Sequence, residues 1–277
     1  MSESASTGAS VIVAAGQFAP GMDKTWNVAA VAGLAASAAG RGASLLALPE
    51  YSSYMAPELD GRIVEHAEPV DGWFAQQMQD IASSHGVALV VGMNERIDGA
   101  DRVYNTVLSI APDGAVAGTY RKTHLYDAFG ATESTWIKPG ATVPPTTMSV
   151  KGITVGVQTC YDLRFPEVTR TLVDAGADLV VIPAQWVPGP LKLDHWQTLL
   201  AARAIENTVY VCAADQAAPL GAGRSMVIDP VGNVLGQCGT ATELAIGTVD
   251  PEMIVATRRT NPVLAVRRFA VMPMLAG

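Results

Sequence analysis

Cys160 has the surroundings of a nucleophile. A short run of mostly β-branched, apolar residues, 153–157, precedes it and predicts a buried strand. Pro166 then opens a predicted helix, 166–175, because proline suits the first turn of a helix. Between a strand end and a helix start, backbone N–H groups point outward and the positive end of the helix dipole favours a thiolate. The position therefore predicts a reactive thiol.

Charged neighbours strengthen this interpretation. A lone cysteine is most often a small buried hydrophobe. Here Asp162, Arg164 and Glu167 place three charges within seven positions of the thiol, in a chain that is only 16% charged. A cysteine that only packs in a core needs no such neighbours. A catalytic role then requires a base and a partner for an oxyanion elsewhere in the chain.

Two further charged residues stand where other strands have just ended. Glu50 follows S-L-L-A-L-P, and Lys122 follows G-T-Y-R. Strand ends in α/β folds converge on one face, so residues distant in the sequence can meet there. A carboxylate, an ammonium and a thiol are the groups that covalent acyl transfer requires. We therefore expect Glu50, Lys122 and Cys160 to form one site.

The composition restricts the class of protein. The chain has 277 residues, of which 49% are hydrophobic, and a formal net charge of −8. It can build a large core, and an acidic surface argues against nucleic acid or an anionic membrane as a partner. The first ten residues lack the basic start of a signal peptide. These features favour a cytoplasmic protein that acts on a small molecule.

The cysteines and histidines argue against disulfides and metals. Cys160, Cys212 and Cys238 form no C-x-x-C pair and no even framework, which indicates free thiols in a reducing compartment. The four histidines are scattered without the spacing of metal ligands. We expect no metal, and acyl transfer by a thiol, a carboxylate and an ammonium needs no organic cofactor.

Apolar runs that alternate with helical stretches predict an α/β fold. The predicted strands are 11–18, 44–48, 87–92, 102–110, 115–120, 153–157, 178–182, 208–213, 224–228, 233–237 and 244–249, and the predicted helices are 24–39, 71–85, 166–175, 193–205 and 251–258. Turn signals at 112–114 and 229–232 link neighbouring strands as hairpins, so the sheets should be mixed. We expect a flexible N-terminus, 1–9, and a single domain, 10–277, in which helices cover mixed sheets.

Three blocks of the sequence resemble a known family. The blocks A-L-P-E, Y-R-K-T-H-L and C-Y-D-L-R-F-P-E are similar to the three catalytic blocks of the nitrilase, or carbon–nitrogen hydrolase, superfamily. The likeness extends to P-A-Q-W, R-A-I-E-N and N-P-V-L-A-V-R-R, and it covers nearly the whole chain in order. The six blocks occupy residues 47–50, 120–125, 160–167, 183–186, 203–207 and 261–268.

The resemblance implies a fold and a set of roles. The implied fold is a single-domain α-β-β-α sandwich, which usually assembles through helices into a homodimer or a larger homo-oligomer. Transferred residue by residue, Glu50 is the general base, Lys122 stabilises the oxyanion and Cys160 is the nucleophile. Glu133, in A-T-E-S, is similar in context to a second glutamate of the family. The backbone N–H of Tyr161 is a further oxyanion donor, and Lys122 should lower the pKa of the thiol.

The residue after the cysteine bears on the reaction. Nitrilases of this superfamily usually place Trp-Glu there, whereas Tyr161 resembles the omega-amidase and deaminated-glutathione amidase branches. The implied reaction is hydrolysis of a small carboxamide, first an aliphatic or ω-dicarboxylic monoamide, through a thioester. Hydrolysis of a nitrile or of an N-carbamoyl amide remains an alternative. Outside the family stand a papain-like hydrolase that pairs Cys160 with His195, and an inactive interaction module.

Four residues are predicted to line the substrate pocket. Gln185 and Trp186 end a predicted strand on the site face. Tyr54 lies four residues after the predicted base and could form a wall. Arg164 could bind a substrate carboxylate with two hydrogen bonds. Alternatively, it could pair with Asp162 or with the more distant Glu206 and only brace the site.

Overall fold

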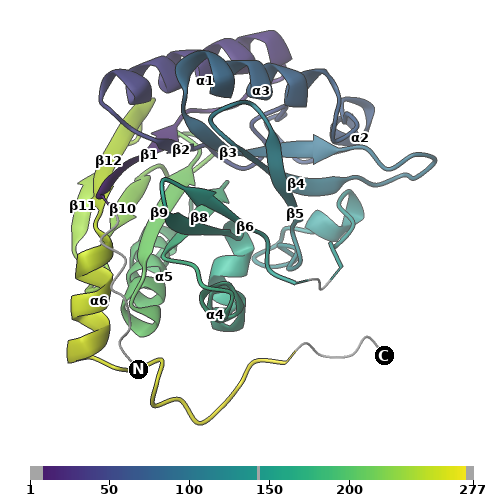
Figure 1. The fold of residues 1–277 in the computed structure, drawn as a ribbon. Coiled ribbons are helices and arrows are strands. Elements are labelled where there is room, and N and C mark those ends of the chain that lie inside the picture. Colours follow the sequence, from purple (N-terminus) through teal and green to yellow (C-terminus); the bar gives the residue numbers. More distant parts are fainter. Residues whose placement is uncertain (1–8, 142–143, 273–277) are drawn as a thin grey trace.

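Two six-stranded β-sheets face each other at the centre of the molecule, and helices cover the outer face of each (Figure 1). The computed structural model describes residues 9–141 and 144–272. The strands of the first sheet are, in spatial order, β12 (Glu243–Val249), β1 (Val11–Gln17), β2 (Leu45–Ala47), β3 (Ala88–Glu95), β4 (Tyr104–Ile110) and β5 (Val116–Arg121). Those of the second are β11 (Val234–Gln237), β10 (Met226–Ile228), β9 (Tyr210–Asp215), β8 (Leu179–Ala184), β7 (Ile153–Val157) and β6 (Thr147–Val150).

Both sheets are mixed, as the hairpin signals predicted. Strands β1, β2 and β3 pair in parallel, and so do β7, β8 and β9. The outer strands of each sheet pair antiparallel. The carboxyl ends of the two parallel sets are where residues distant in the sequence come together.

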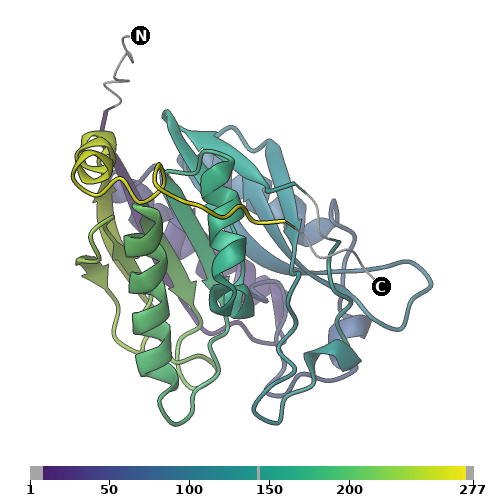
Figure 2. The ribbon, with the colours of Figure 1, turned by 90° about the horizontal axis from the view of Figure 1, so that it is seen from below.

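The helices form the two outer layers. Helices α1 (Lys24–Gly40) and α3 (Trp73–His85) cover the first sheet, and α4 (Pro166–Asp174) and α5 (Lys192–Asn207) lie side by side on the second (Figure 2). The remaining elements are the short α2 (Arg62–Glu65), α6 (Pro251–Thr260) and two 3₁₀ turns, η1 (Glu133–Thr135) and η2 (Cys160–Arg164). The order of layers is the predicted α-β-β-α sandwich.

Alternate residues along the inner strands enter different cores. In β1, Val13 and Ala15 lie in the core between the sheets, whereas Ala14 lies in the core beneath α1 and α3. In β2, Leu45 and Leu46 divide in the same way. Because strand side chains point alternately to opposite faces, a strand covered on both faces must be apolar throughout. The continuous apolar runs of the sequence follow from this arrangement.

The sequence prediction missed one helix and one strand, as well as the two 3₁₀ turns, and most of one predicted segment lies outside the described residues. Helix α2 has only four residues, and β6, which pairs antiparallel with β7, follows a stretch rich in proline. Neither is long enough to show a clear period. Of the predicted flexible N-terminus, 1–9, residues 1–8 lie outside the part that the structure describes.

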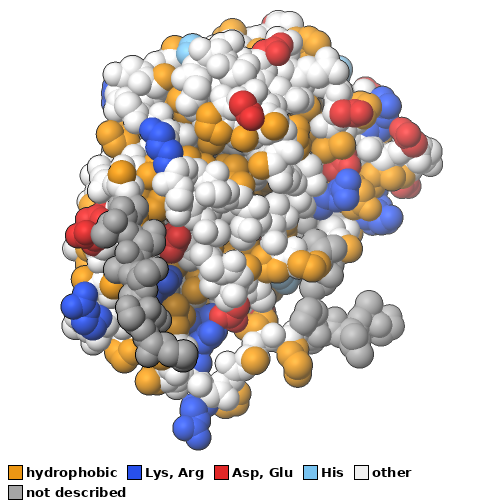
Figure 3. Space-filling model, in the orientation of Figure 1, with side chains coloured by type: hydrophobic (Ala, Val, Ile, Leu, Met, Phe, Trp, Pro, Cys, Tyr) orange, Lys and Arg blue, Asp and Glu red, His pale blue; other side chains and the backbone are white. Residues whose placement is uncertain are grey.

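After α6 the chain runs back across α5 and α4 (Figure 2), where Arg267 forms an ion pair with Asp174 of α4 at 2.6 Å. On the face drawn in Figure 3, basic and acidic side chains are scattered among hydrophobic and neutral ones. None of the described helices is both long enough and apolar enough to cross a membrane.

Candidate active site

Four predicted site residues meet where strands and loops end. Glu50 lies three residues after β2, Lys122 directly follows β5, and Cys160 lies three residues after β7. Glu133 opens η1 in the long loop after β5. All four residues are buried, with relative exposures of 6% or less. Glu50 and Lys122 extend from the first sheet and Cys160 from the second, so the site spans both sheets.

Lys122 lies between two carboxylates. Its Nζ is 2.9 Å from Oε1 of Glu50, and 3.0 and 2.9 Å from the two oxygens of Glu133. Glu133 is held in turn by the hydroxyl of Tyr51 at 2.6 Å and by the backbone N–H of Tyr126 at 2.5 Å. The ammonium is therefore fixed by a carboxylate that is itself fixed at both oxygens.

Glu50 is also held at both oxygens. Its Oε1 accepts a hydrogen bond from Nδ2 of Asn105 at 2.6 Å, and its Oε2 accepts one from the backbone N–H of Gln185 at 2.7 Å. The carbonyl oxygen of the same Gln185 accepts a hydrogen bond from Sγ of Cys160 at 3.5 Å. Gln185, the residue directly after β8, thus positions the carboxylate of Glu50 through its N–H and the thiol of Cys160 through its carbonyl oxygen.

Asp162 links the turn that carries Cys160 to the segment that carries Lys122. Its Oδ2 accepts hydrogen bonds from the N–H of Thr159 at 3.2 Å and from the hydroxyl of Tyr120 at 2.7 Å. Its Oδ1 accepts one from the backbone N–H of His124 at 3.1 Å. A single buried carboxylate therefore sets the position of η2 against the end of β5.

Two backbone features support the site. Cys160 has a φ of 45°, in the left-handed region that a non-glycine residue adopts only under strain. Gly92 of β3 lies directly against the backbone at Glu50. A Cβ on Gly92 would stand 2.7 Å from Cα of Glu50 and 2.8 Å from the carbonyl oxygen of Pro49. Any larger residue at position 92 would displace Glu50.

The charges at Lys122 and Glu133 stabilise each other. Burial lowers the pKa of Lys122, but the charges of Glu133 and Glu50 outweigh burial and raise this pKa well above its usual value. Burial raises the pKa of Glu133, but the charge of Lys122 and the hydrogen bond from Tyr51 bring it below its usual value. At neutral pH Lys122 is an ammonium and Glu133 is a carboxylate.

The thiol of Cys160 is not acidified. Burial and then the charge of Glu50 raise its pKa well above the usual value, and the opposing effect of Lys122 is smaller. Lys122 acts in the expected direction, but the prediction of a lowered thiol pKa is wrong for the net value. It considered the cation and neglected both the burial and the neighbouring carboxylate. The thiol keeps its proton at neutral pH.

A cavity of about 500 Å³ opens onto these groups. Glu50, Lys122, Glu133 and Cys160 all lie in its wall. The rest of the wall comes from within segments 51–59, 126–132, 185–188 and 219–220. A nucleophile, a carboxylate and an ammonium thus face a space large enough for a small molecule.

Known proteins match this chain over most of its length. The sequence profile of the family described as carbon–nitrogen hydrolase matches residues 12–259. The chain is 36% identical over 262 residues to an Escherichia coli protein named deaminated glutathione amidase, covering 94% of this chain and 98% of that protein. This chain belongs to the carbon–nitrogen hydrolase family.

Solved structures of other members superpose over almost the whole chain. Nit3 of Saccharomyces cerevisiae, a member of branch 10 of the nitrilase superfamily, gives a TM-score of 0.83 at 27% identity, over 94% of this chain and 97% of that one. An amidase from Nesterenkonia sp. gives 0.74 at 25% identity, over 96% and 99%. In that structure the acetamide moiety of fluoroacetamide is added covalently at the active-site cysteine. The family and the sandwich fold predicted from the three blocks are confirmed, and the protein is a hydrolase of non-peptide carbon–nitrogen bonds.

Three of the four residues predicted to line the pocket of this carbon–nitrogen hydrolase do line a cavity at Cys160, and the fourth does not. A narrow second cavity of about 10 Å³ adjoins the first at Cys160, and Arg164, Gln185 and Trp186 line it. Tyr54 lines neither cavity: it is 1% exposed and its ring stacks on His66 at a centroid distance of 4.3 Å. The prediction of Tyr54 as a pocket wall is therefore not met. The chain turns at residue 51 and directs Tyr54 into the core.

Arg164 does not pair with either carboxylate considered for bracing. The oxygens of Asp162 accept the hydrogen bonds described above, and Glu206 pairs with Arg203 at 2.9 Å. Nη2 of Arg164 instead lies 3.3 Å from Nδ1 of His195. A papain-like mechanism would require His195 to contact the thiol of Cys160. In the structure, Nδ1 of His195 instead contacts the guanidinium of Arg164.

Among the residues that contact the site and that sequence reasoning missed are Tyr51, Asn105, Tyr126 and Lys192. Asn105 is a polar residue inside the apolar run of β4, and that exception was a usable signal. Tyr51 was overlooked in favour of Tyr54. Lys192, which lines the narrow cavity, carried no signal in the sequence.

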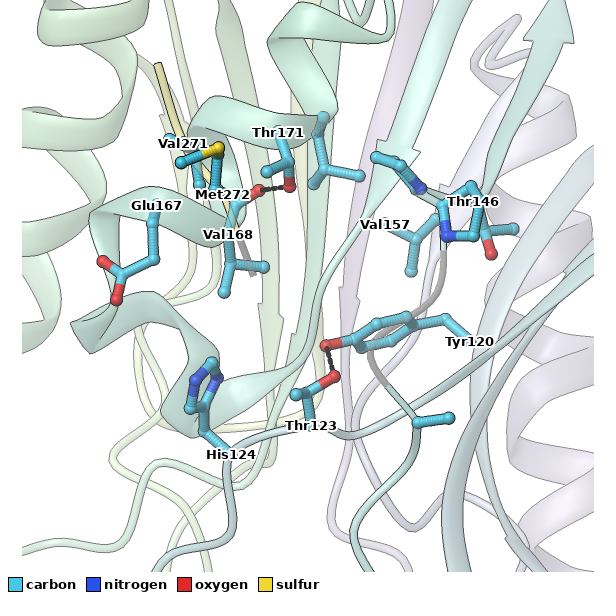
Figure 4. Close-up of a pocket in the computed structure, with 14 residues that line it drawn as sticks. Tyr120, Thr123, His124, Thr146, Val157, Glu167, Val168, Thr171, Val271 and Met272 are labelled. Carbon is cyan, nitrogen blue, oxygen red and sulfur yellow. Dashed lines mark hydrogen bonds between the residues drawn. The ribbon is translucent and has the colours of Figure 1, made fainter. Parts of the chain in front are cut away.

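Another cavity of this hydrolase, of about 320 Å³, lies away from the thiol. Tyr120, His124, Thr171 and Met272 are among its lining residues (Figure 4). It shares no residue with either cavity at Cys160. Within residues 9–141 and 144–272, no group of three or more His, Cys, Asp or Glu side chains could hold a metal ion.

Proposed function

We propose that this protein is a cysteine-dependent amidase that hydrolyses a small carboxamide to a carboxylate and ammonia through a thioester. The observation that carries the proposal is the double role of Gln185, whose N–H holds the carboxylate of Glu50 and whose carbonyl contacts the thiol of Cys160. A thiol that keeps its proton beside a carboxylate is a suitable starting point for general-base catalysis.

In the acylation half, Glu50 takes the thiol proton as Sγ of Cys160 attacks the amide carbonyl carbon. A carbon–sulfur bond forms, and the carbonyl oxygen becomes an oxyanion that Lys122 and the backbone N–H of Tyr161 stabilise. The carbon–nitrogen bond then breaks as Glu50 returns the proton to the leaving nitrogen. Ammonia departs, and the acyl group remains on sulfur as a thioester.

In the deacylation half, Glu50 takes a proton from water, and the resulting oxygen attacks the thioester carbon. The same two donors stabilise the second oxyanion. The carbon–sulfur bond breaks, and the proton on Glu50 returns to sulfur. The product leaves as the carboxylic acid and gives its proton to the released ammonia, which yields the carboxylate and ammonium. Glu133 acts through Lys122, because its two oxygens fix the ammonium where the oxyanion forms.

An aliphatic or ω-dicarboxylic monoamide is the substrate class that we propose first. The names of the E. coli relative and of the Nesterenkonia enzyme, both amidases, support an amide over a nitrile or an N-carbamoyl compound. The cavity of about 500 Å³ suits a small molecule.

The test is ammonia release from a panel of amides, nitriles and N-carbamoyl compounds. We expect activity on amides that Cys160→Ala abolishes and that Cys212→Ala retains, because Cys212 is a buried thiol in the core between the sheets. Intact-mass spectrometry should find the acyl adduct on Cys160 alone. Full activity in Cys160→Ala, or an adduct on Cys212 or Cys238, would contradict the mechanism.

We further propose that the protein is cytoplasmic and works as a homodimer or a larger homo-oligomer. Its three cysteines are free and buried, which suits a reducing compartment. Apolar side chains such as Ile205 on α5 and Phe269 beyond α6 are exposed and could form a subunit contact. Light scattering should give a mass of two or more chains, and a monomer at micromolar concentration would reject this assembly.

A further inference from the structure

Lys192 is a buried lysine whose neighbours are aromatic rather than acidic. It is the first residue of α5 and only 5% exposed. The indole N–H of Trp186 donates to its carbonyl oxygen at 2.6 Å, which fixes its backbone. Its Nζ donates to the hydroxyl of Tyr126 at 2.8 Å and lies 4.6, 4.5 and 5.3 Å from the ring centres of Tyr126, Phe129 and Trp186.

Two positive charges lie together at this place without a carboxylate partner in the part of the chain that the structure describes. Within the described residues, neither Lys192 nor Arg164 forms an ion pair with a carboxylate. The guanidinium of Arg164 lies over the same Trp186 ring, 4.9 Å from its centre, and its Nε is a buried atom without a hydrogen-bond partner. The N-terminus of α5 adds its own positive dipole end. Burial and the charge of Arg164 lower the pKa of Lys192.

The two cations adjoin the thiol on the side that the proposed chemistry leaves free. In the tetrahedral intermediate the oxyanion faces Lys122 and the leaving nitrogen faces Glu50. The third substituent, which is the acyl chain, must point elsewhere. The large cavity holds Glu50 and Lys122, whereas the narrow cavity that also touches Cys160 holds Arg164 and Lys192. Tyr126, Gln185 and Val187 line both cavities, so an acyl chain on Sγ of Cys160 can extend past them from the large cavity toward Arg164 and Lys192.

We propose that Lys192 determines specificity by binding a carboxylate on the acyl chain of the substrate, beside Arg164. The inference rests on the amidase function proposed above and names the group that recognises the acyl side. The carboxylate takes the place of the Tyr126 hydroxyl as partner of the ammonium and neutralises a charge that the protein leaves open. The narrow cavity must widen to admit it. Phe129 lines the adjoining large cavity, its ring centre lies 4.5 Å from Nζ of Lys192, and it is 71% exposed, so its movement disturbs little packing.

The experiment compares two substrates that differ only in charge. The monoamide of glutaric acid carries a carboxylate where glutaric diamide carries a neutral amide of the same shape. We expect the wild-type protein to prefer the monoamide, and Lys192→Met to lower kcat/KM for the monoamide by about 10- to 100-fold, mainly through KM. For the diamide, kcat/KM should change by less than about threefold.

Two variants serve as controls. Lys138→Met removes another lysine that lies over a tyrosine ring, 5.8 Å from the centre of Tyr104, but lies outside both cavities, and it should leave both substrates unaffected. Lys192→Arg keeps the positive charge and should keep most of the preference for the monoamide. An equal loss on both substrates in Lys192→Met, or no loss on either, would overturn the role of Lys192.

A binding measurement separates this inference from the proposed function. In Cys160→Ala, calorimetry should show the glutaric monoamide binding about 10- to 100-fold more tightly than in Cys160→Ala/Lys192→Met. Equal binding by the two variants would overturn the inference whether or not the enzyme turns amides over. Absence of ammonia release from every amide would instead reject the proposed function.

Discussion

Lys122 and Lys192 are both buried and both line cavities at Cys160, but within residues 9–141 and 144–272 only Lys122 is paired with carboxylates. Lys122 has two carboxylates within 3.0 Å, and each of those carboxylates has further hydrogen-bond donors. Lys192 has a tyrosine hydroxyl, aromatic ring faces and a neighbouring arginine. As a result, the pKa of Lys122 is raised and that of Lys192 is lowered, although burial acts on both in the same direction.

The difference shows how a buried charge can serve two purposes. A cation that is closed in by its own carboxylates keeps its place whether or not substrate is bound, which suits the stabilisation of an oxyanion. A cation without a counter-charge destabilises the folded protein and is relieved only when an anion arrives. The contrast gives opposite expectations for the same substitution at the two lysines.

The largest effect is expected from Lys122→Met. Removing the ammonium leaves Glu50 and Glu133 buried together without a counter-charge, and the free energy of unfolding should fall by about 3–5 kcal/mol. Turnover should fall by at least about 10²-fold, since an oxyanion donor is lost. Urea denaturation and the ammonia assay measure the two effects. A variant as stable as the wild-type protein would show that Lys122 does not stabilise the two buried carboxylates.

A smaller effect is expected from Glu133→Gln, which keeps the shape of the side chain and removes one of the two charges around Lys122. Because Lys122 retains Glu50, the ammonium should stay in the site but be less firmly placed. We expect kcat to fall by about 10- to 100-fold, less than for outright loss of the donor, with little change in KM. Steady-state kinetics on one amide decides this. An effect confined to KM would instead place Glu133 in substrate binding.

The smallest effect that we expect is the change in the free energy of unfolding caused by Lys192→Met. The variant should unfold within about 1 kcal/mol of the wild-type protein at pH 7, or be slightly more stable, because it removes a buried cation without a counter-charge. The pKa of Lys192 is lower in the folded state than its usual 10.5. The unfolded state therefore binds the proton more tightly, and the wild-type protein should gain stability relative to the variant as pH rises from the lowered pKa toward 10.5.

Urea midpoints of both proteins between pH 7 and pH 10 test this sign. A loss of stability comparable to that of Lys122→Met, or a difference that grows in the opposite direction with pH, would show that Lys192 is neutralised within the protein after all.

Much of the fold and the central part of the site could be predicted because both depend on local pattern. Continuous apolar runs specify strands covered on two faces, and turn residues specify the hairpins of the mixed sheets. Glu50 and Cys160 each follow such a run, and Lys122 follows the second strand of a predicted hairpin, so their strand ends could be expected to converge. The bounds of β7 were predicted to the residue, since its five residues lie between clear turn signals.

The remaining features of the site depend on distances between residues, which the sequence pattern does not determine. The sign of the thiol pKa follows from how deeply Cys160 is buried beside Glu50, and the sequence shows only that Lys122 joins them. Tyr51 and Tyr54 differ by three positions, and only the turn of the chain decides which one faces the cavity. In the sequence, Lys192 cannot be distinguished from an ordinary helix lysine. Only the structure shows that, among the described residues, no carboxylate pairs with it.

Because the site is divided between the two sheets, the rate of turnover depends strongly on the position of one sheet relative to the other. The base and the ammonium move with one sheet and the nucleophile with the other, joined by the contacts of Gln185 and Asp162. A slip of about one ångström would separate the reacting groups and leave every helix and strand intact. Substitutions deep in the core between the sheets, at Val13 or Val181 for example, can therefore silence the enzyme without unfolding it.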